Sequence, residues 1–307
     1  MFIHLNTHSV YSSMRGLLSL PDLMNLSRSY GMDTLALTDV NGMWGFIRFV
    51  QHCKDAKIKP IAGVNLITEK DETILLAETQ YGYENICRAV SAVHDDPRQS
   101  VTDILRSRSA GLFVLAHKES TSKKLIDFIP DTHLFVELRS GVQESSAQKL
   151  AKKLKLETVA TGDVYFRSQS DHDAYLTLRA IENNTTLEQL GMMKCKSDQH
   201  WFRSEAEMVK LFPNSLDALN NSRYLADRCK TDWSFINTIF PGLSLKETHR
   251  SNKKLKDKVY AGAQVRYDGI DETIRQRIEY ELGIITQKGF APYFLIVHDI
   301  VTKTRAT

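Results

Sequence analysis

Short apolar segments of five to eight residues recur through the first half of this chain, and longer amphipathic stretches separate most of them. They are residues 2–6, 34–38, 59–66, 73–77, 111–116, 133–138 and 157–161. Apolar segments of this length are typical of buried strands, and strands that alternate with helices form largely parallel sheets. About seven such strands suit a (β/α) barrel, whose ligands bind at the carboxyl ends of the strands. The alternation therefore predicts an α/β fold, with a helix over residues 46–56 between the second and third of these strands.

Beyond residue 170 the pattern is mainly helical. Helices are expected over residues 171–181 and 215–229, and Ser204 with Glu207 has the spacing of a capping box at another helix start. Residues 231–250 resemble a loop that contains the turn signal Pro241-Gly242, and residues 252–307 are again mostly helical. We predict two domains: a barrel with a helical C-terminal part over residues 1–235, and a linker followed by helices over 236–307.

Bulk composition excludes several classes of protein. Hydrophobic residues make up 42% and charged residues 25% of the 307 positions, as in ordinary globular proteins. A net charge of +3 does not by itself indicate a nucleic-acid binder. The four cysteines are widely spaced without a Cys-x-x-Cys pair, which argues against a zinc ribbon or a disulfide framework. Neither a signal peptide nor an apolar run of membrane-spanning length is present, so we expect a cytoplasmic protein without membrane association.

Common catalytic motifs are also missing. The sequence has no Gly-x-Ser-x-Gly elbow, no Walker-type phosphate loop and no Rossmann fingerprint. Most histidines are scattered and are expected to be structural, although His8 and His117 would fall near strand ends. The first strand itself carries His4 and Asn6 on one face, in the alternating arrangement that can hold a metal when both residues are histidines.

An ordered set of motifs resembles the N-terminal PHP (polymerase and histidinol phosphatase) domain of bacterial DNA polymerase III alpha subunits, the C-family polymerases. The matching runs are residues 4–9, 36–39, 42–46, 58–63, 159–164, 279–282 and 289–297, so the resemblance covers nearly the whole chain. It implies a distorted seven-stranded (β/α) barrel followed by the first helices of the polymerase palm region. Arg15-Gly16, which ends the first motif, resembles the error-prone branch of the family.

The resemblance also implies a metal cluster held by His, Asp, Glu and Cys side chains. Carried onto this chain, the ligand positions keep a ligand-type residue at His4 and Asp163, with Glu72 as a third candidate. The other positions line the former metal pocket without supplying the family's ligand: Asn6, Arg15, Val40, Asn65, Lys118 and Tyr165. We therefore expect a degenerate site with no bound metal and no catalytic residue. A buried Asp163 would then need a cationic partner, such as Arg15 or Lys118.

The leading hypothesis is that the chain is the scaffold portion of a DNA-directed DNA polymerase, a nucleotidyltransferase of DNA replication that requires Mg²⁺. The chain alone is expected to lack polymerase activity and any cofactor. Its implied partners are the rest of the alpha subunit, a proofreading exonuclease and, through the whole enzyme, DNA. The alternatives are a metal-dependent PHP phosphoesterase or 3′–5′ exonuclease, and a free-standing adaptor derived from a truncated polymerase. Replicative or error-prone duty and the oligomeric state stay open.

Overall fold

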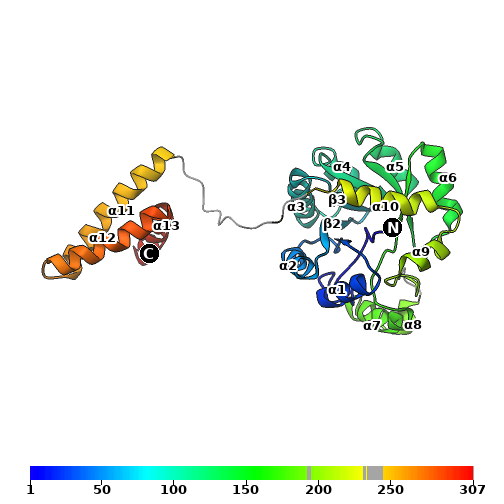
Figure 1. The fold of residues 1–307 in the computed structure, drawn as a ribbon, viewed down its shortest axis with the longest axis horizontal. Helices are drawn as coiled ribbons and strands as arrows, with labels where there is room; N and C mark the ends of the chain where they lie inside the picture. Colours follow the sequence, from blue (N-terminus) through cyan, green and yellow to red (C-terminus); the bar gives the residue numbers. More distant parts are fainter. Residues whose placement is uncertain (192–194, 231–232, 234–244, 307) are drawn as a thin grey trace. The chain divides into compact units, whose positions relative to one another are not determined.

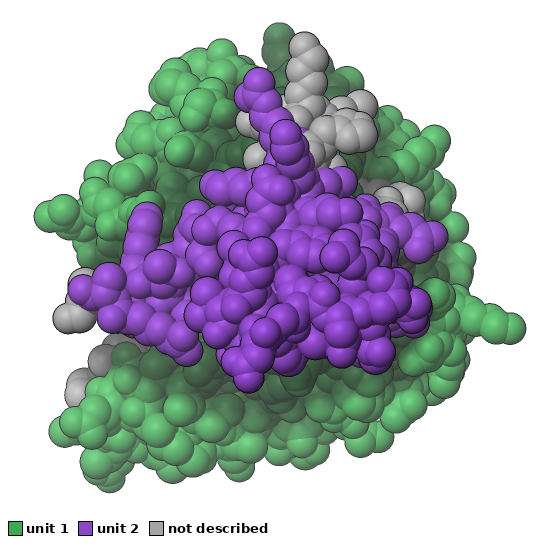
Figure 2. Space-filling view, turned by 90° about the vertical axis from the view of Figure 1, so that its left-hand side faces the viewer, with its two compact units in different colours: residues 1–233 green, residues 234–307 purple. Residues whose placement is uncertain are grey.

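A computed structural model describes residues 1–191, 195–230, 233 and 245–306. The chain divides into two compact units, residues 1–233 and 234–307, which are coloured separately in Figure 2. The predicted domain boundary at residues 235 and 236 and the predicted turn at Pro241-Gly242 lie outside the described residues. Residues 245–250 were expected to be loop, but the structure shows them as the start of a helix, so this prediction is wrong.

The first unit is built on one mixed sheet whose strand order follows the sequence (Figure 1). Its strands are β1 (Thr34–Leu37), β2 (Lys59–Ile67), β3 (Glu72–Ala77), β4 (Leu112–Ala116), β5 (Leu134–Arg139) and β6 (Thr158–Thr161). Neighbouring strands are parallel except at β3, which is antiparallel to both β2 and β4. The connection between β2 and β3 is only residues 68–71, which allows a hairpin but is too short for a parallel crossover.

The extended N-terminal segment joins the two edges of this sheet. Backbone hydrogen bonds connect Ala36 N to His4 O (3.1 Å) and Thr38 N to Thr7 O (2.9 Å) on the β1 side, and Val164 N to Asn6 O (3.0 Å) and His8 N to Val164 O (2.9 Å) beyond β6. The segment therefore takes the place of the predicted first strand, although only Thr7 in it is assigned a β-bridge. The α/β fold class is confirmed, with six regular strands in the described residues and this segment in the seventh place.

Helices pack around the sheet (Figure 1). They are α1 (Leu20–Ser29), α2 (Phe46–Ala56), α3 (Gln80–Asp95), α4 (Val101–Leu105), α5 (Glu119–Leu125), α6 (Glu144–Leu154), α7 (His172–Glu182), α8 (Leu187–Leu190), α9 (Glu205–Leu211) and α10 (Leu216–Arg228). The predicted capping box is present at α9, where Ser204 and Glu207 bond to each other's backbone N–H groups. The 46–56 helix was predicted with the bounds that the structure shows.

The two largest apolar clusters of the first unit lie on opposite faces of its sheet. The larger one lies between the sheet and the helices, and it includes Leu23, Phe46 and Leu112. The smaller one gathers side chains from the opposite face of the strands, such as Ile74 and Phe113, together with residues of α10. The Lys59 ammonium at the start of β2 donates to the Ala226 carbonyl of α10 (2.6 Å). Helix α10 therefore closes the end of the barrel where the parallel strands begin, which leaves their carboxyl ends free for a site.

The second unit consists of α11 (Leu245–Arg266), α12 (Glu272–Gln287) and α13 (Ala291–Ala306), which confirms a helical C-terminal segment. Its small apolar core contains Leu255, Leu282, Ala291 and Leu295. No helix in the described part of the chain is both long and apolar enough to cross a bilayer.

Candidate functional site

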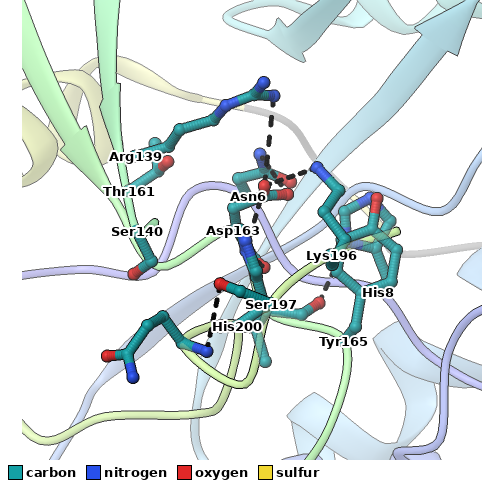
Figure 3. Close-up of polar contacts among 12 residues, drawn as sticks. Asn6, His8, Arg139, Ser140, Thr161, Asp163, Tyr165, Lys196, Ser197 and His200 are labelled. Atoms are coloured by element: carbon teal, nitrogen blue, oxygen red, sulfur yellow. Dashed lines mark hydrogen bonds and ion pairs between the residues drawn. The ribbon is translucent and has the colours of Figure 1, made fainter. Parts of the chain in front are cut away.

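Polar side chains from many elements meet at the carboxyl ends of the parallel strands (Figure 3). The antiparallel β3 contributes from its first residue, because its start lies at the same end of the sheet. These residues are Asn6, His8, Asn65, Glu72, His117, Glu137, Arg139, Asp163, Tyr165, Lys196 and His200. Ends of neighbouring parallel strands are where such folds place their ligands, so this cluster is the candidate site.

Asp163 is the most heavily contacted carboxylate of the cluster. Its side chain is fully buried, and its Oδ2 atom lies 2.6 Å from Lys196 Nζ, 3.2 Å from His200 Nδ1 and 4.0 Å from Arg139 Nη1. Figure 3 shows the lysine and arginine side chains extending toward it from different elements. Burial alone would raise the pKa of this carboxyl group, but the Lys196 ammonium and the neighbouring donors hold the pKa well below its usual value. Asp163 is therefore ionised and paired.

Glu137 is linked to Asp163 through Asn6 and accepts hydrogen bonds from two neutral side chains. Its Oε1 atom accepts hydrogen bonds from Asn6 Nδ2 (2.8 Å) and Thr161 Oγ1 (2.8 Å), and the same amide nitrogen lies 3.4 Å from Asp163 Oδ1. Burial raises the pKa of the Glu137 carboxyl group, because the interior disfavours its charged form. Asn6, at a position where the family resemblance implies a metal ligand, thus bridges two carboxyl groups by hydrogen bonding.

His117 and Arg139 surround the third carboxyl group, Glu72. His117 Nε2 lies 3.9 Å from Glu72 Oε2, and its Nδ1 lies 3.7 Å from Glu137 Oε2. Arg139 Nη1 lies 3.7 Å from Glu72 Oε2. Burial, together with the charge of Arg139, lowers the pKa of His117 to about 4. Burial opposes ionisation of Glu72, but the charges of Lys196 and Arg139, together with His117, outweigh it and lower the pKa of Glu72 to about 2.

His8 completes the cluster from the N-terminal segment. Its ring stacks on the Tyr165 ring, with 3.9 Å between centroids, and its Nδ1 lies 2.9 Å from the Val164 carbonyl oxygen. Since Nδ1 must donate to that carbonyl, Nε2 is the acceptor for the Asn65 amide nitrogen at 3.2 Å. Burial lowers the pKa of His8 to about 4, so the imidazole is neutral near pH 7.

A cleft of about 570 Å³ opens above these residues. Its lining carries one carboxyl group, Glu72, and five basic side chains: Arg15, Lys118, Arg139, Arg179 and Lys196. Arg15 and Arg179 both pair with Glu182 near its rim. The exposed end of the site is therefore predominantly cationic, whereas the carboxyl groups of Glu137 and Asp163 lie deeper.

Most of the predicted site residues lie in the cluster or in the cleft, but His4 does not. Asn6, Asn65, Glu72, Asp163 and Tyr165 lie within the cluster, and Arg15 and Lys118 line the cleft. His4 lies elsewhere: its ring packs between Phe2 and Phe202, and its Nε2 lies 2.8 Å from the Arg203 carbonyl oxygen. The backbone N–H of Val40 donates to Ser12 Oγ.

Several residues of the site were not predicted. The cationic partner of Asp163 exists, but it is Lys196 rather than Arg15 or Lys118. His8, not His4, is the histidine of the first segment that reaches the site, and His117 joins it there. The nearness of His8 and His117 to strand ends was the only signal for either. The remaining unpredicted residues are Glu137, Arg139 and His200.

The donor set does not fit the metal cluster that the family resemblance implies. Lys196 Nζ and Arg139 Nη1 approach the carboxylates that a dication would need, and like charges repel strongly at such distances. Asn6 and Asn65 stand where that resemblance places ligands and are engaged in hydrogen bonds. Within the described ranges, no three His, Cys, Asp or Glu side chains are grouped so that they could hold a metal ion.

Two family models match this chain in succession. The PHP domain matches residues 4–170, and the bacterial DNA polymerase III alpha NTPase domain matches residues 253–307. A DNA polymerase III subunit alpha of Pasteurella multocida is 30% identical, over 98% of this chain and 30% of that protein. An error-prone DNA polymerase of Symbiobacterium thermophilum is 28% identical, over 99% of this chain and 32% of that protein.

The chain thus spans about 30% of the length of the curated relatives that it matches. Among solved structures, an amidohydrolase of Chromobacterium violaceum with bound sulfate and no metal aligns at 11% identity and a TM-score of 0.38. That alignment covers 54% of this chain and 88% of the other. A likeness at this level carries no argument about function.

Proposed function

The chain belongs to the PHP domain family, and we propose that it is the PHP portion and the first polymerase helices of a bacterial DNA polymerase III alpha subunit. The observation that carries this proposal is the order of the two family matches along one chain, in the arrangement that relatives with these names share over nearly its whole length. The whole protein would then be a DNA-directed DNA polymerase that uses deoxynucleoside triphosphates and Mg²⁺.

Within that enzyme, the barrel would serve as a scaffold rather than as a hydrolase. A hydrolytic metal centre must generate hydroxide and polarise a phosphoryl oxygen, and both tasks need a filled set of ligands. Here Lys196 and Arg139 approach the carboxylates, and Asn6 and Asn65 bond to neighbouring side chains. These contacts support a site that stabilises the barrel through ion pairs and hydrogen bonds.

The partners follow from the same proposal. The remainder of the alpha subunit would pack on the helices of the second unit, and DNA would be bound by the whole enzyme in the cytoplasm. The barrel would offer a docking face for a separate proofreading exonuclease, as the family resemblance implies. Relatives with replicative and with error-prone names both match, so either duty is compatible with the proposal.

The test uses the native gene product. An antibody raised against residues 1–230 is used to probe a lysate of the source organism and to purify the antigen for a primer-extension assay with Mg²⁺. We expect an antigen about three times as long as this chain that extends the primer, because the chain spans about 30% of its relatives. An antigen no larger than this chain, without extension activity, would contradict the proposal and support a free-standing adaptor.

A further inference from the structure

We infer that the Lys196 ammonium supplies the positive charge that a divalent cation would otherwise supply to this carboxylate cluster, so that removing it makes the fold depend on added metal. The inference rests on the metal-free role proposed for the same site. It goes further because it assigns that role to one side chain outside the strands of the barrel.

The contact geometry singles out one oxygen atom. Asp163 Oδ2 lies 2.6 Å from Lys196 Nζ, and the same oxygen lies 3.2 Å from His200 Nδ1. His200 Nδ1 also lies 3.1 Å from the backbone carbonyl oxygen of Asp163, so this nitrogen acts as a hydrogen-bond donor, and the ammonium group is the nearest cation to the carboxylate oxygen. The side chain of Asp163 is fully buried and that of Lys196 is only 20% exposed, so water screens the pair weakly.

The backbone of Lys196 is held by residues that do not belong to the cluster. Its backbone N–H donates to the Tyr175 hydroxyl at 3.2 Å, and its carbonyl oxygen lies 2.9 Å from His172 Nε2. Both of these partners belong to α7. Its Nζ also lies 5.1 Å from the centre of the Tyr165 ring, within the range of a cation–π contact. The position of the charge is therefore fixed by α7 and by the chain after β6, independently of any metal.

The charges around Asp163 also favour the ammonium group over a divalent cation. Arg139 Nη1 lies between Glu72 and Asp163, at 3.7 and 4.0 Å from their nearest oxygens. The two basic side chains thus face two ionised carboxylates, while the buried Glu137 is held toward its neutral form. Lys196 and Arg139 already offset the two ionised carboxylates, so a dication beside Asp163 would be repelled by both basic groups. Without Lys196, only Arg139 would offset the two carboxylates, and the loss of one partner of a buried ion pair is strongly destabilising.

The experiment compares thermal unfolding of the whole chain as wild type and as Lys196→Met, at pH 7.5 with EDTA or with millimolar MnCl₂. We expect the melting temperature of the wild type to be the same in both conditions. Lys196→Met should melt about 5–10 °C lower in EDTA, because one partner of a buried pair is lost. Mn²⁺ should restore at least half of that loss, and excess EDTA should reverse the restoration.

Two further variants make the outcome specific. Lys118→Met removes a lysine charge from the same cleft, but Lys118 has no ion pair in the described structure. The melting temperature of this variant should therefore stay within about 1 °C of the wild type, and it should not change when Mn²⁺ is added. The double variant Lys196→Met with Asp163→Asn should lose the response to Mn²⁺, because the carboxylate that would bind the ion has gone.

The possible failures are distinguishable. A destabilised Lys196→Met that Mn²⁺ does not rescue, or an undestabilised Lys196→Met, overturns the inference and leaves the proposed scaffold role intact. A wild-type chain that EDTA destabilises and Mn²⁺ restores overturns both, because the native site would then hold metal. Rescue of Lys118→Met to the same extent as Lys196→Met would also overturn the inference, since the effect would not belong to the Asp163 contact.

Discussion

Replacing His8 by glutamine should reduce the dependence of the stability of the barrel on pH. His8 is fully buried against Tyr165, and burial lowers its pKa from 6.5 to about 4. Its neutral form donates from Nδ1 to the Val164 carbonyl and accepts at Nε2 from Asn65. Protonation would place a second N–H donor against the donating Asn65 amide, so the folded protein resists it.

The direction and magnitude of this pH dependence follow from the protons that residue 8 binds in the folded and unfolded states. Between pH 6.5 and about 4, the unfolded chain binds a proton at residue 8 that the folded chain does not, so this contribution to stability is present above pH 6.5 and is lost as the pH falls toward 4. With about 1.4 kcal/mol for each pKa unit, the loss between pH 8 and pH 5 amounts to about 2 kcal/mol. Glutamine does not titrate, so the variant should lack this part of the loss.

Urea unfolding at pH 8 and at pH 5 provides the assay, because a linear extrapolation gives the free energy of unfolding at each pH. Trp233, whose ring contacts Phe46 and Tyr83, is a suitable fluorescence probe for the first unit. The fall in the free energy of unfolding from pH 8 to pH 5 should be about 2 kcal/mol smaller for His8→Gln than for the wild type. His52→Gln in α2 serves as the control and should keep the wild-type difference. An unchanged difference for His8→Gln would refute the reasoning.

Three further substitutions test other parts of the structure by urea unfolding. Gly82→Ala should cost about 1–3 kcal/mol, because the added Cβ would lie 1.9 Å from the Gly111 carbonyl oxygen; a cost below about 0.5 kcal/mol would contradict that close approach. Ser204→Ala should cost about 1 kcal/mol through loss of the capping box with Glu207, and an unchanged stability would show that the cap contributes nothing. Glu137→Gln should cost less stability at pH 8 than at pH 4, because burial raises the pKa of that carboxyl group and so penalises its charged form at the higher pH; an equal or larger cost at pH 8 would contradict the shift.

The elements of the fold were predictable because they depend on local patterns. The 46–56 helix and the strands over residues 59–66 and 73–77 were predicted to within a residue. Burial on one face gives the helix its periodic pattern, and burial on both faces makes the strands nearly continuous apolar runs. The antiparallel direction of β3 was not predicted, although the short connection between residues 67 and 72 already required a hairpin.

The site was less predictable, because it depends on depth along a strand and on contacts between distant segments. His4, Asn6 and His8 alternate onto one face, so periodicity does not say which of them reaches the carboxyl end of the barrel. Four residues of extended chain span about 13 Å, which places His4 deep among aromatic rings and His8 at the site. Burial of Asp163 did predict a cationic partner. Lys196 lies 33 residues further along the chain, where no sequence pattern points toward the barrel.

The central claim is that this PHP domain keeps its barrel but has replaced the metal centre with side-chain contacts. The most direct test is elemental analysis of the purified chain for zinc, manganese and iron, together with hydrolysis of a generic phosphodiester in the presence of added Mn²⁺. We predict no stoichiometric metal and no metal-dependent turnover. Two or three metal ions per chain with metal-dependent hydrolysis would contradict the account and show that the domain is a phosphoesterase.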